Sequence, residues 1–175
     1  VGPTPARGAE WYFDFISPFA WLQWNRLQPL RAKLDIRPVP VVLGAVLAHF
    51  ETKGPAEVPD KRAFTYRFVQ WQAGRLGVPL TFPPTHPFNP LPALRLAVAL
   101  NARDEVVDAI FRELWQFGFA LDSAAALAPL AQRFGIDDVA AVIGASPVKD
   151  RLRQNTETAI ANRVFGVPTL RIDEQ

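Results

Sequence analysis

The segment Trp11-Tyr12-Phe13-Asp14-Phe15-Ile16-Ser17-Pro18-Phe19-Ala20 decides how this chain folds. Its first six residues are almost all apolar, which is typical of a central strand covered on both faces, so we expect a strand over about residues 10–16. Ser17 followed by Pro18 is a strong helix-start signal, because serine caps free N–H groups and proline suits the first helical position. The sequence therefore predicts a strand that runs directly into a helix, which an apolar stripe extends to about residue 34.

A second segment, Phe165-Gly166-Val167-Pro168-Thr169-Leu170, lies far downstream and begins another short strand. Residues 36–43 are predicted as a further strand, at an edge of the sheet or irregular at its start, because its prolines cannot donate to a ladder. A strand that ends in a nucleophile-like residue at a helix N-terminus, together with a remote Val-Pro-Thr, is the skeleton of a thioredoxin fold. Ser17 takes the place of the usual cysteine.

Between these segments the apolar periodicity is helical. We expect helices near 44–51, 60–77, 90–101, 104–118, 122–134 and 137–144, followed by one over about 148–162. So long a stretch is better interpreted as an inserted domain than as a crossover connection. The predicted fold class is α/β: a thioredoxin-like domain formed by 9–43 and 147–175, with an all-helical insertion at 44–146.

Two features of the sequence concern its ends. The chain contains no Met, so we expect that Val1 is not the translation start. The chain ends at Gln175, soon after the Pro168 strand, where a thioredoxin fold still needs an antiparallel strand and a closing helix. We expect that strand and helix to follow.

Composition excludes several classes of function. The chain has 175 residues, of which 49% are hydrophobic, enough for a sizeable core. Nineteen basic and seventeen acidic residues give a net charge of +2, which makes no case for nucleic-acid binding. No apolar run approaches the ~20 residues of a membrane span, so we expect a cytoplasmic protein with neither nucleic acid nor membrane as a partner. The absence of cysteine excludes a dithiol redox centre and, with only two histidines, predicts no metal site.

Without cysteine, any thiol chemistry on this scaffold needs a thiol from outside, and glutathione is the first candidate. A helix N-terminus stabilises a sulfur anion, and the Ser17 hydroxyl can donate a hydrogen bond to it. Such bonding would lower the thiol pKa from ~8.5 to about 6.5–7. The alternative is that Ser17 only caps the helix.

The second segment supports the thiol interpretation. Val167-Pro168-Thr169 looks like the cis-proline loop of thioredoxin folds, in which the residue before proline offers its N–H and C=O to an extended peptide such as glutathione. The alternative is a trans proline at a strand start.

The two ends of the chain and the layout between them resemble a known family. Residues 13–22, the helical insertion and Val164-Phe165-Gly166-Val167-Pro168-Thr169 are similar to 2-hydroxychromene-2-carboxylate isomerases and kappa-class glutathione transferases, within the disulfide-oxidoreductase-A-like group. The resemblance implies that Ser17 contacts the glutathione sulfur, that Val167 and Pro168 hold the tripeptide, and that the protein is a homodimer.

The resemblance also suggests where a small aromatic substrate binds. Family isomerases have a basic residue just after the second strand, where this chain has Gly44-Ala45-Val46-Leu47; His49 and Lys53 lie nearby and are candidates. His86 and Asn89 lie in a proline-rich segment that matches the family's second-substrate pocket. The alternatives are a His49 packed in the core, a solvated Lys53, a His86 that faces water and an Asn89 that caps a helix.

Together, these expectations predict a glutathione-dependent isomerase that acts in aromatic-compound degradation. The resemblance implies a cis/trans isomerisation by reversible thiolate addition, with Ser17 as the catalytic residue. Two alternatives stay open: a kappa-like glutathione transferase, and a redox-inactive thioredoxin-fold module that binds a peptide along its Pro168 edge.

Overall fold

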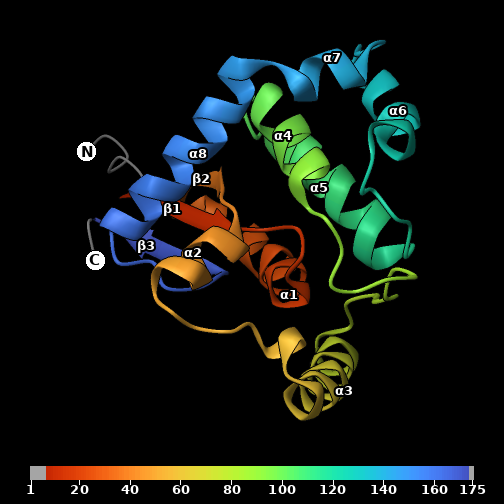
Figure 1. The fold of residues 1–175 in the computed structure, drawn as a ribbon. Helices are drawn as coiled ribbons and strands as arrows, with labels where there is room; N and C mark the ends of the chain where they lie inside the picture. Colours follow the sequence, from red (N-terminus) through yellow and green to blue (C-terminus); the bar gives the residue numbers. More distant parts are fainter. Residues whose placement is uncertain (1–6, 174–175) are drawn as a thin grey trace.

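The computed structural model describes residues 7–173, in which helices surround a three-stranded mixed sheet (Figure 1). The central strand, β1 (Arg7–Phe13), lies between β2 (Leu34–Pro40), which runs parallel to it, and β3 (Thr169–Ile172), which runs antiparallel. The α/β thioredoxin-like prediction is confirmed. The edge position predicted for the second strand is also confirmed, and there its prolines interrupt only one ladder.

Both parallel strands end about three residues earlier than the sequence predicted. β1 stops at Phe13, because the N–H of Ser17 donates to the carbonyl of Asp14 at 3.1 Å and closes a turn before the helix. β2 stops at Pro40, because α2 (Leu43–His49) begins almost at once. Apolar character alone does not distinguish a buried strand from the buried turn that follows it.

The first helix begins where Ser17-Pro18 predicted and ends sooner than expected. α1 spans Pro18–Leu27, with Ser17 as its N-cap, and a short 3-10 helix follows at Gln28–Ala32. Pro29 has no N–H and clashes with the preceding turn, so it does not continue an α-helix. The predicted apolar stripe therefore divides between two kinds of helix.

The middle of the chain is helical, as predicted. The helices are α2, α3 (Pro59–Leu76), α4 (Leu91–Ala99), α5 (Asp104–Phe111), α6 (Ala124–Gln132), α7 (Val139–Gly144) and α8 (Ser146–Ala161), with a 3-10 turn at Pro55–Glu57. The helix predicted over 104–118 changes at Arg112–Gln116 into a π-helical turn. α8 then returns the chain to β3 at the sheet (Figure 1).

One hydrophobic core joins the sheet to the insertion. Trp11 and Phe13 of β1 stack with ring centroids 4.6 Å apart, and Phe15, just beyond the strand, meets Phe111 of α5 at 4.7 Å. Trp11, Trp21, Trp24 and Trp115 are all buried. The division of the chain into 9–43 with 147–175 and 44–146 therefore stays a prediction, because the packing is continuous across it.

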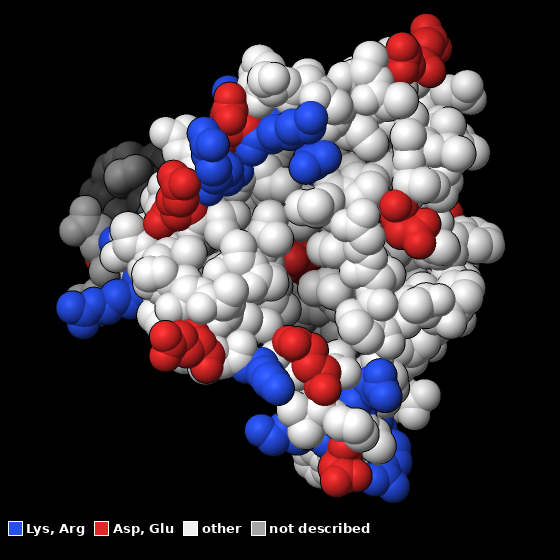
Figure 2. All heavy atoms as spheres, viewed as in Figure 1, with Lys and Arg blue, Asp and Glu red and all other residues white. Residues whose placement is uncertain are grey.

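The face shown in Figure 2 carries no large patch of a single charge sign. On the face shown in Figure 2, acidic and basic side chains are interspersed over a mainly uncharged surface. Within residues 7–173 no helix is both long enough and apolar enough to cross a bilayer.

Candidate functional site

Ser17 lies at the point where β1 gives way to α1. Its Oγ accepts a hydrogen bond from the Ala20 N–H at 3.3 Å, which makes it the N-cap of α1, with Pro18 next. The cap uses Oγ as an acceptor and leaves the hydroxyl hydrogen free to donate. Ser17 is only 6% exposed, so a sulfur that reached Oγ would also be largely removed from water.

The carbonyl groups of the turn before Ser17 are all occupied. The Asp14 carbonyl accepts from the Ser17 N–H, the buried Phe15 carbonyl accepts from Trp115 Nε1 at 2.8 Å, and the Ile16 carbonyl pairs with His86 Nε2 at 2.7 Å. Two of the three donors come from the insertion. The insertion therefore fixes the backbone that positions Ser17.

Asp14 is a fully buried carboxyl at the same turn. Its Oδ1 accepts from the Ile16 N–H at 3.1 Å and its Oδ2 from the Leu43 N–H at 2.9 Å, which ties the turn to the start of α2. Burial raises the pKa of Asp14 to about 7, although the two backbone hydrogen bonds act in the opposite direction. When Asp14 is protonated, it places no negative charge beside the helix N-terminus, where a thiolate would bind.

The Val167-Pro168 loop precedes β3, and its peptide bond is cis. Thr169 Oγ1 donates to the Gly166 carbonyl at 2.8 Å and closes the loop. Within residues 7–173 we find no hydrogen bond from the backbone N–H or to the backbone C=O of Val167. Both groups are thus available to an extended peptide.

The strand register brings Ser17 and this loop to the same end of the sheet. Tyr12 of β1 is paired with Thr169 of β3, at the C-terminal end of one strand and the N-terminal end of the other. One further step in this antiparallel register sets Pro168 beside Phe13. The two features on which the sequence prediction depended therefore lie toward the same end of the sheet.

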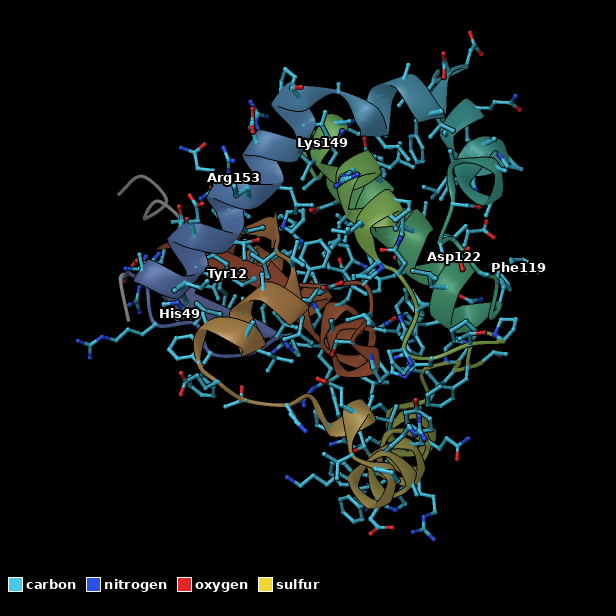
Figure 3. The ribbon with its side chains drawn as sticks, in the orientation of Figure 1. Tyr12, His49, Phe119, Asp122, Lys149 and Arg153 are labelled. Carbon is cyan, nitrogen blue, oxygen red and sulfur yellow. The ribbon has the colours of Figure 1, made fainter. Side chains whose placement is uncertain are left out.

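The four candidates for the second substrate are not all in one place. His49 is exposed at the C-terminal end of α2 (Figure 3), and Lys53 is exposed in the loop beyond it. Asn89 Oδ1 accepts from the Leu91 N–H at 3.2 Å, but Asn89 lies one residue before Pro90, the N-cap of α4, and so does not cap the helix itself. His86 differs from these three, because its ring forms a hydrogen bond with the turn before Ser17.

Both ring nitrogens of His86 are engaged. Because a carbonyl only accepts, Nε2 must carry the hydrogen that is donated to Ile16, and Nδ1, 2.5 Å from the Tyr66 hydroxyl, then accepts from it. Burial lowers the pKa of His86, and Arg62 lowers it further, which favours this neutral form. His86 therefore holds the backbone beside Ser17, a role that its place in the sequence did not indicate.

A substitution of His86 by phenylalanine tests this role. The variant keeps a ring but leaves the Ile16 carbonyl without its donor, so we expect the free energy of unfolding to fall by about 1–3 kcal/mol. The same change at the exposed His49 is the matched control and should alter stability by no more than about 0.5 kcal/mol. Equal losses in chemical denaturation of the two variants would show that the hydrogen bond at Ile16 contributes nothing.

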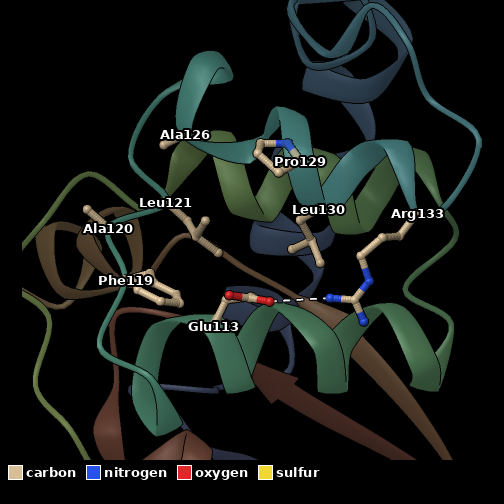
Figure 4. A pocket seen from close by; sticks show the side chains of 8 residues that line it. All are labelled: Glu113, Phe119, Ala120, Leu121, Ala126, Pro129, Leu130 and Arg133. Atoms are coloured by element: carbon tan, nitrogen blue, oxygen red, sulfur yellow. Dashed lines mark hydrogen bonds and ion pairs between the residues drawn. The ribbon is translucent and has the colours of Figure 1, made fainter.

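A cavity apart from this site lies between α6 and the segment before it. Its volume is about 410 Å³, and the ion pair Glu113–Arg133 borders it (Figure 4). The rest of its lining is apolar: Phe119, Ala120, Leu121, Ala126, Pro129 and Leu130. None of the residues predicted to act in the site lines this cavity. Among residues 7–173, no three histidine, aspartate or glutamate side chains gather as metal ligands.

Comparison with known proteins agrees with this geometry. A family model described as DSBA-like thioredoxin domain matches residues 10–175, nearly the whole chain. The chain belongs to the DsbA-like thioredoxin family. Within this family, the DsbA-like domain described here has serine at the start of α1 and no cysteine anywhere.

Distant relatives match over nearly the full length of the DsbA-like domain. The 2-hydroxychromene-2-carboxylate isomerase of Pseudomonas putida is 28% identical over 173 residues, which cover 95% of this chain and 85% of that one. Glutathione S-transferase kappa 2 of Caenorhabditis elegans is 25% identical over 181 residues, covering 94% and 80%. These relatives are enzymes by name, and the resemblance read from the sequence is confirmed as homology.

Solved structures show the same architecture. A structure of 2-hydroxychromene-2-carboxylate isomerase superposes with a TM-score of 0.82 at 25% identity and covers 96% of this chain and 86% of that one. Cytosolic disulfide reductase DsbM from Pseudomonas aeruginosa with GSH superposes with a TM-score of 0.68 at 12% identity, covering 96% and 87%. The second likeness shows the fold alone.

Sequence reasoning missed Asp14, Tyr66 and the role of Trp115. The one available signal was Asp14 itself, a lone acidic residue inside an otherwise apolar and aromatic run, where an ionisable group is expensive to bury. Trp115 and Tyr66 gave no such signal, because their partners lie 100 and 20 residues away in the chain.

Proposed function

We propose that this DsbA-like domain is a glutathione-dependent isomerase of the 2-hydroxychromene-2-carboxylate isomerase type, acting on a small aromatic substrate in the cytoplasm. The observation that carries the proposal is the Ser17 hydroxyl, which is fixed by Ala20 at the start of α1 and keeps its hydrogen free. The unpaired Val167 backbone at the same end of the sheet supports it. A peptide with a thiol fits this pair of features.

Each part of the site has a separate task in this proposal. Bound glutathione supplies a thiolate that adds reversibly to an activated double bond, so that the bond can rotate before elimination restores it. The N-terminus of α1 and the Ser17 hydroxyl stabilise negative charge on the sulfur. The Val167 N–H and C=O orient the tripeptide as an added strand. The buried turn keeps these groups in place before the ligand arrives, which lowers the cost of binding.

Calorimetric titration tests glutathione binding directly. We expect glutathione to bind the wild-type chain at neutral pH, and its thiol to ionise on binding, seen as thiolate absorbance near 240 nm. S-methylglutathione has the same peptide but no ionisable thiol, so it should bind more weakly. If glutathione does not bind, the proposal fails; if both peptides bind equally without thiolate absorbance, Ser17 has no part in ionisation.

A kappa-like glutathione transferase is the second candidate, supported by the match to the kappa-class protein of Caenorhabditis elegans. Both activities use the same thiolate and differ in its fate. An isomerase releases glutathione unchanged, whereas a transferase consumes it. The concentration of free thiol during turnover of a candidate substrate therefore separates the two.

A further inference from the structure

A second cavity lies at the outer edge of β2, where the C-terminal end of α4 and the middle of α8 meet the strand. Its volume is about 230 Å³, and none of the residues proposed to bind glutathione lines it. The polar side chains of its lining are Arg37 of β2, Asn101 just after α4, and Arg151 and Asn155 of α8. Three elements distant in sequence therefore contribute polar groups to one small cavity.

The charges in the lining of this cavity have one sign. Both ionisable residues are arginines, and no acidic side chain from the described part of the chain joins them. Arg151 forms no ion pair within residues 7–173, and its Nη1 donates instead to Asn101 Oδ1 at 3.1 Å. Arg37 pairs with Glu10, but Glu10 also pairs with Arg171 at 3.4 Å, so one carboxylate serves two guanidinium groups. The cavity therefore suits an anion and not a cation.

Two asparagine side chains add uncharged groups. Asn155 Nδ2 donates to the Pro40 carbonyl at 3.1 Å and ties α8 to the end of β2. Asn101 and Ala102 have φ values of 57° and 47°, so the chain turns sharply after α4 and brings Asn101 to Arg151. This conformation is unusual for alanine, and such outliers are concentrated at functional sites. Since Asn101 Oδ1 accepts from Arg151, its amide nitrogen can donate to a ligand.

The outer edge of β2 does not suit an added strand. Pro38 and Pro40 are alternate residues of β2 and have no N–H, so a peptide along this edge would lack donors at both positions. A ligand must therefore be held by side chains. Because sites for drug-sized ligands have volumes of about 300–1,000 Å³, the volume of this cavity indicates a smaller molecule.

A phosphoryl group matches these donors better than a carboxylate does. Guanidinium groups bind both, but one carboxylate is occupied by a single bidentate arginine. A phosphate monoester carries a charge of about −1.5 to −2 at pH 7 and three acceptor oxygens, enough for arginines from two elements. We propose that this cavity binds a small organic phosphate, with the phosphoryl group between Arg37 and Arg151 and the carbon chain against Pro38 and Val98. This goes beyond the proposed function and does not depend on it.

Titration of the whole chain with glycerol 3-phosphate, followed by amide NMR shifts, tests the site. We expect saturable shifts centred on residues 98–102 and 151–155, with a dissociation constant of about 1 mM or lower at low salt. Glycerol should not bind, and inorganic phosphate should bind more weakly than the ester because it has no carbon chain. Equal affinity for phosphate and the ester would overturn the assignment to an organic ligand. Shifts at the turn before Ser17 alone would overturn the site.

Arg151→Gln and Arg153→Gln are a matched pair of variants on α8. Each removes one positive charge, but Arg151 lines the cavity, whereas Arg153 is exposed on α8 (Figure 3) and pairs with Asp150 and Glu157. We expect Arg151→Gln to weaken binding of glycerol 3-phosphate by about tenfold or more, and Arg37→Gln to do the same. Arg153→Gln should weaken it by less than about twofold, because solvent and salt screen that charge. Equal losses for Arg151→Gln and Arg153→Gln would show general charge attraction and overturn the proposal.

Discussion

Replacing Ser17 by alanine is expected to lower turnover by about 10- to 1000-fold while leaving the fold intact. The lost hydroxyl is the side-chain donor at the start of α1. Removing one hydrogen-bond donor to an anion in an active site lowers turnover by a factor of about this size. The pKa of bound glutathione should rise in the same variant, because the helix N-terminus then stabilises the thiolate alone. Steady-state rates and a titration of absorbance near 240 nm measure the two effects.

Ser123→Ala is the matched control for this variant. Ser123 is also an N-cap, and its Oγ accepts from the Ala126 N–H at 3.1 Å at the start of α6. Loss of either cap should cost about 1 kcal/mol of stability. Only the Ser17 variant should lose turnover. If both variants lose stability and neither loses turnover, Ser17 is a cap and takes no part in the chemistry.

Asp14→Asn is expected to change how stability depends on pH. The pKa of Asp14 is about 7 in the folded protein and 3.8 in the reference state, so between these values the unfolded chain loses a proton that the folded protein keeps. The folded state of the wild type therefore loses stability as pH rises from about 4 to 7, by up to about 4 kcal/mol, and the loss levels off above pH 7. Asparagine does not ionise, so this contribution disappears.

Urea denaturation of both proteins at pH 4 and pH 8 measures the effect. The substitution also changes the free energy of unfolding directly, because an amide supplies one acceptor oxygen where the carboxylate has two. This direct change is the same at both values of pH. Relative to the wild type, the variant should therefore have a higher free energy of unfolding at pH 8 than at pH 4. Asp138→Asn is the control: Asp138 caps α7 through Oδ1 at 2.9 Å from the Ala141 N–H. A constant difference for Asp14→Asn would mean that its carboxyl ionises normally.

The sequence predicted well those parts of the fold that depend on neighbouring residues. Ser17-Pro18 marked the start of α1, and the helical periodicity located the α-helices from α2 to α8 to within a few residues, apart from the end of α5. These signals are local, because caps and amphipathic faces repeat within one or two turns. The π-helical turn at Arg112–Gln116 left no such signal, and the helix predicted there is too long.

The site was predicted only in part, because much of it depends on contacts between distant residues. Ser17 and Val167 were recognisable from their motifs, and the register of β1 and β3 sets those motifs at one end of the sheet. His86 was predicted to bind substrate, whereas the bond that the structure shows from its ring to the Ile16 carbonyl joins residues 70 positions apart. No periodicity or composition encodes such a pair.

The bonds from Trp115 and His86 to the turn before Ser17 bear on how this scaffold can be redesigned. A new specificity would ordinarily be sought by shortening or replacing the segment that carries His86. Here such a graft would also remove hydrogen bonds that hold the backbone just before the N-terminus of α1. A change to the segment that selects the substrate therefore also affects the position of Ser17. A successful graft must supply its own hydrogen-bond donor for the Ile16 carbonyl.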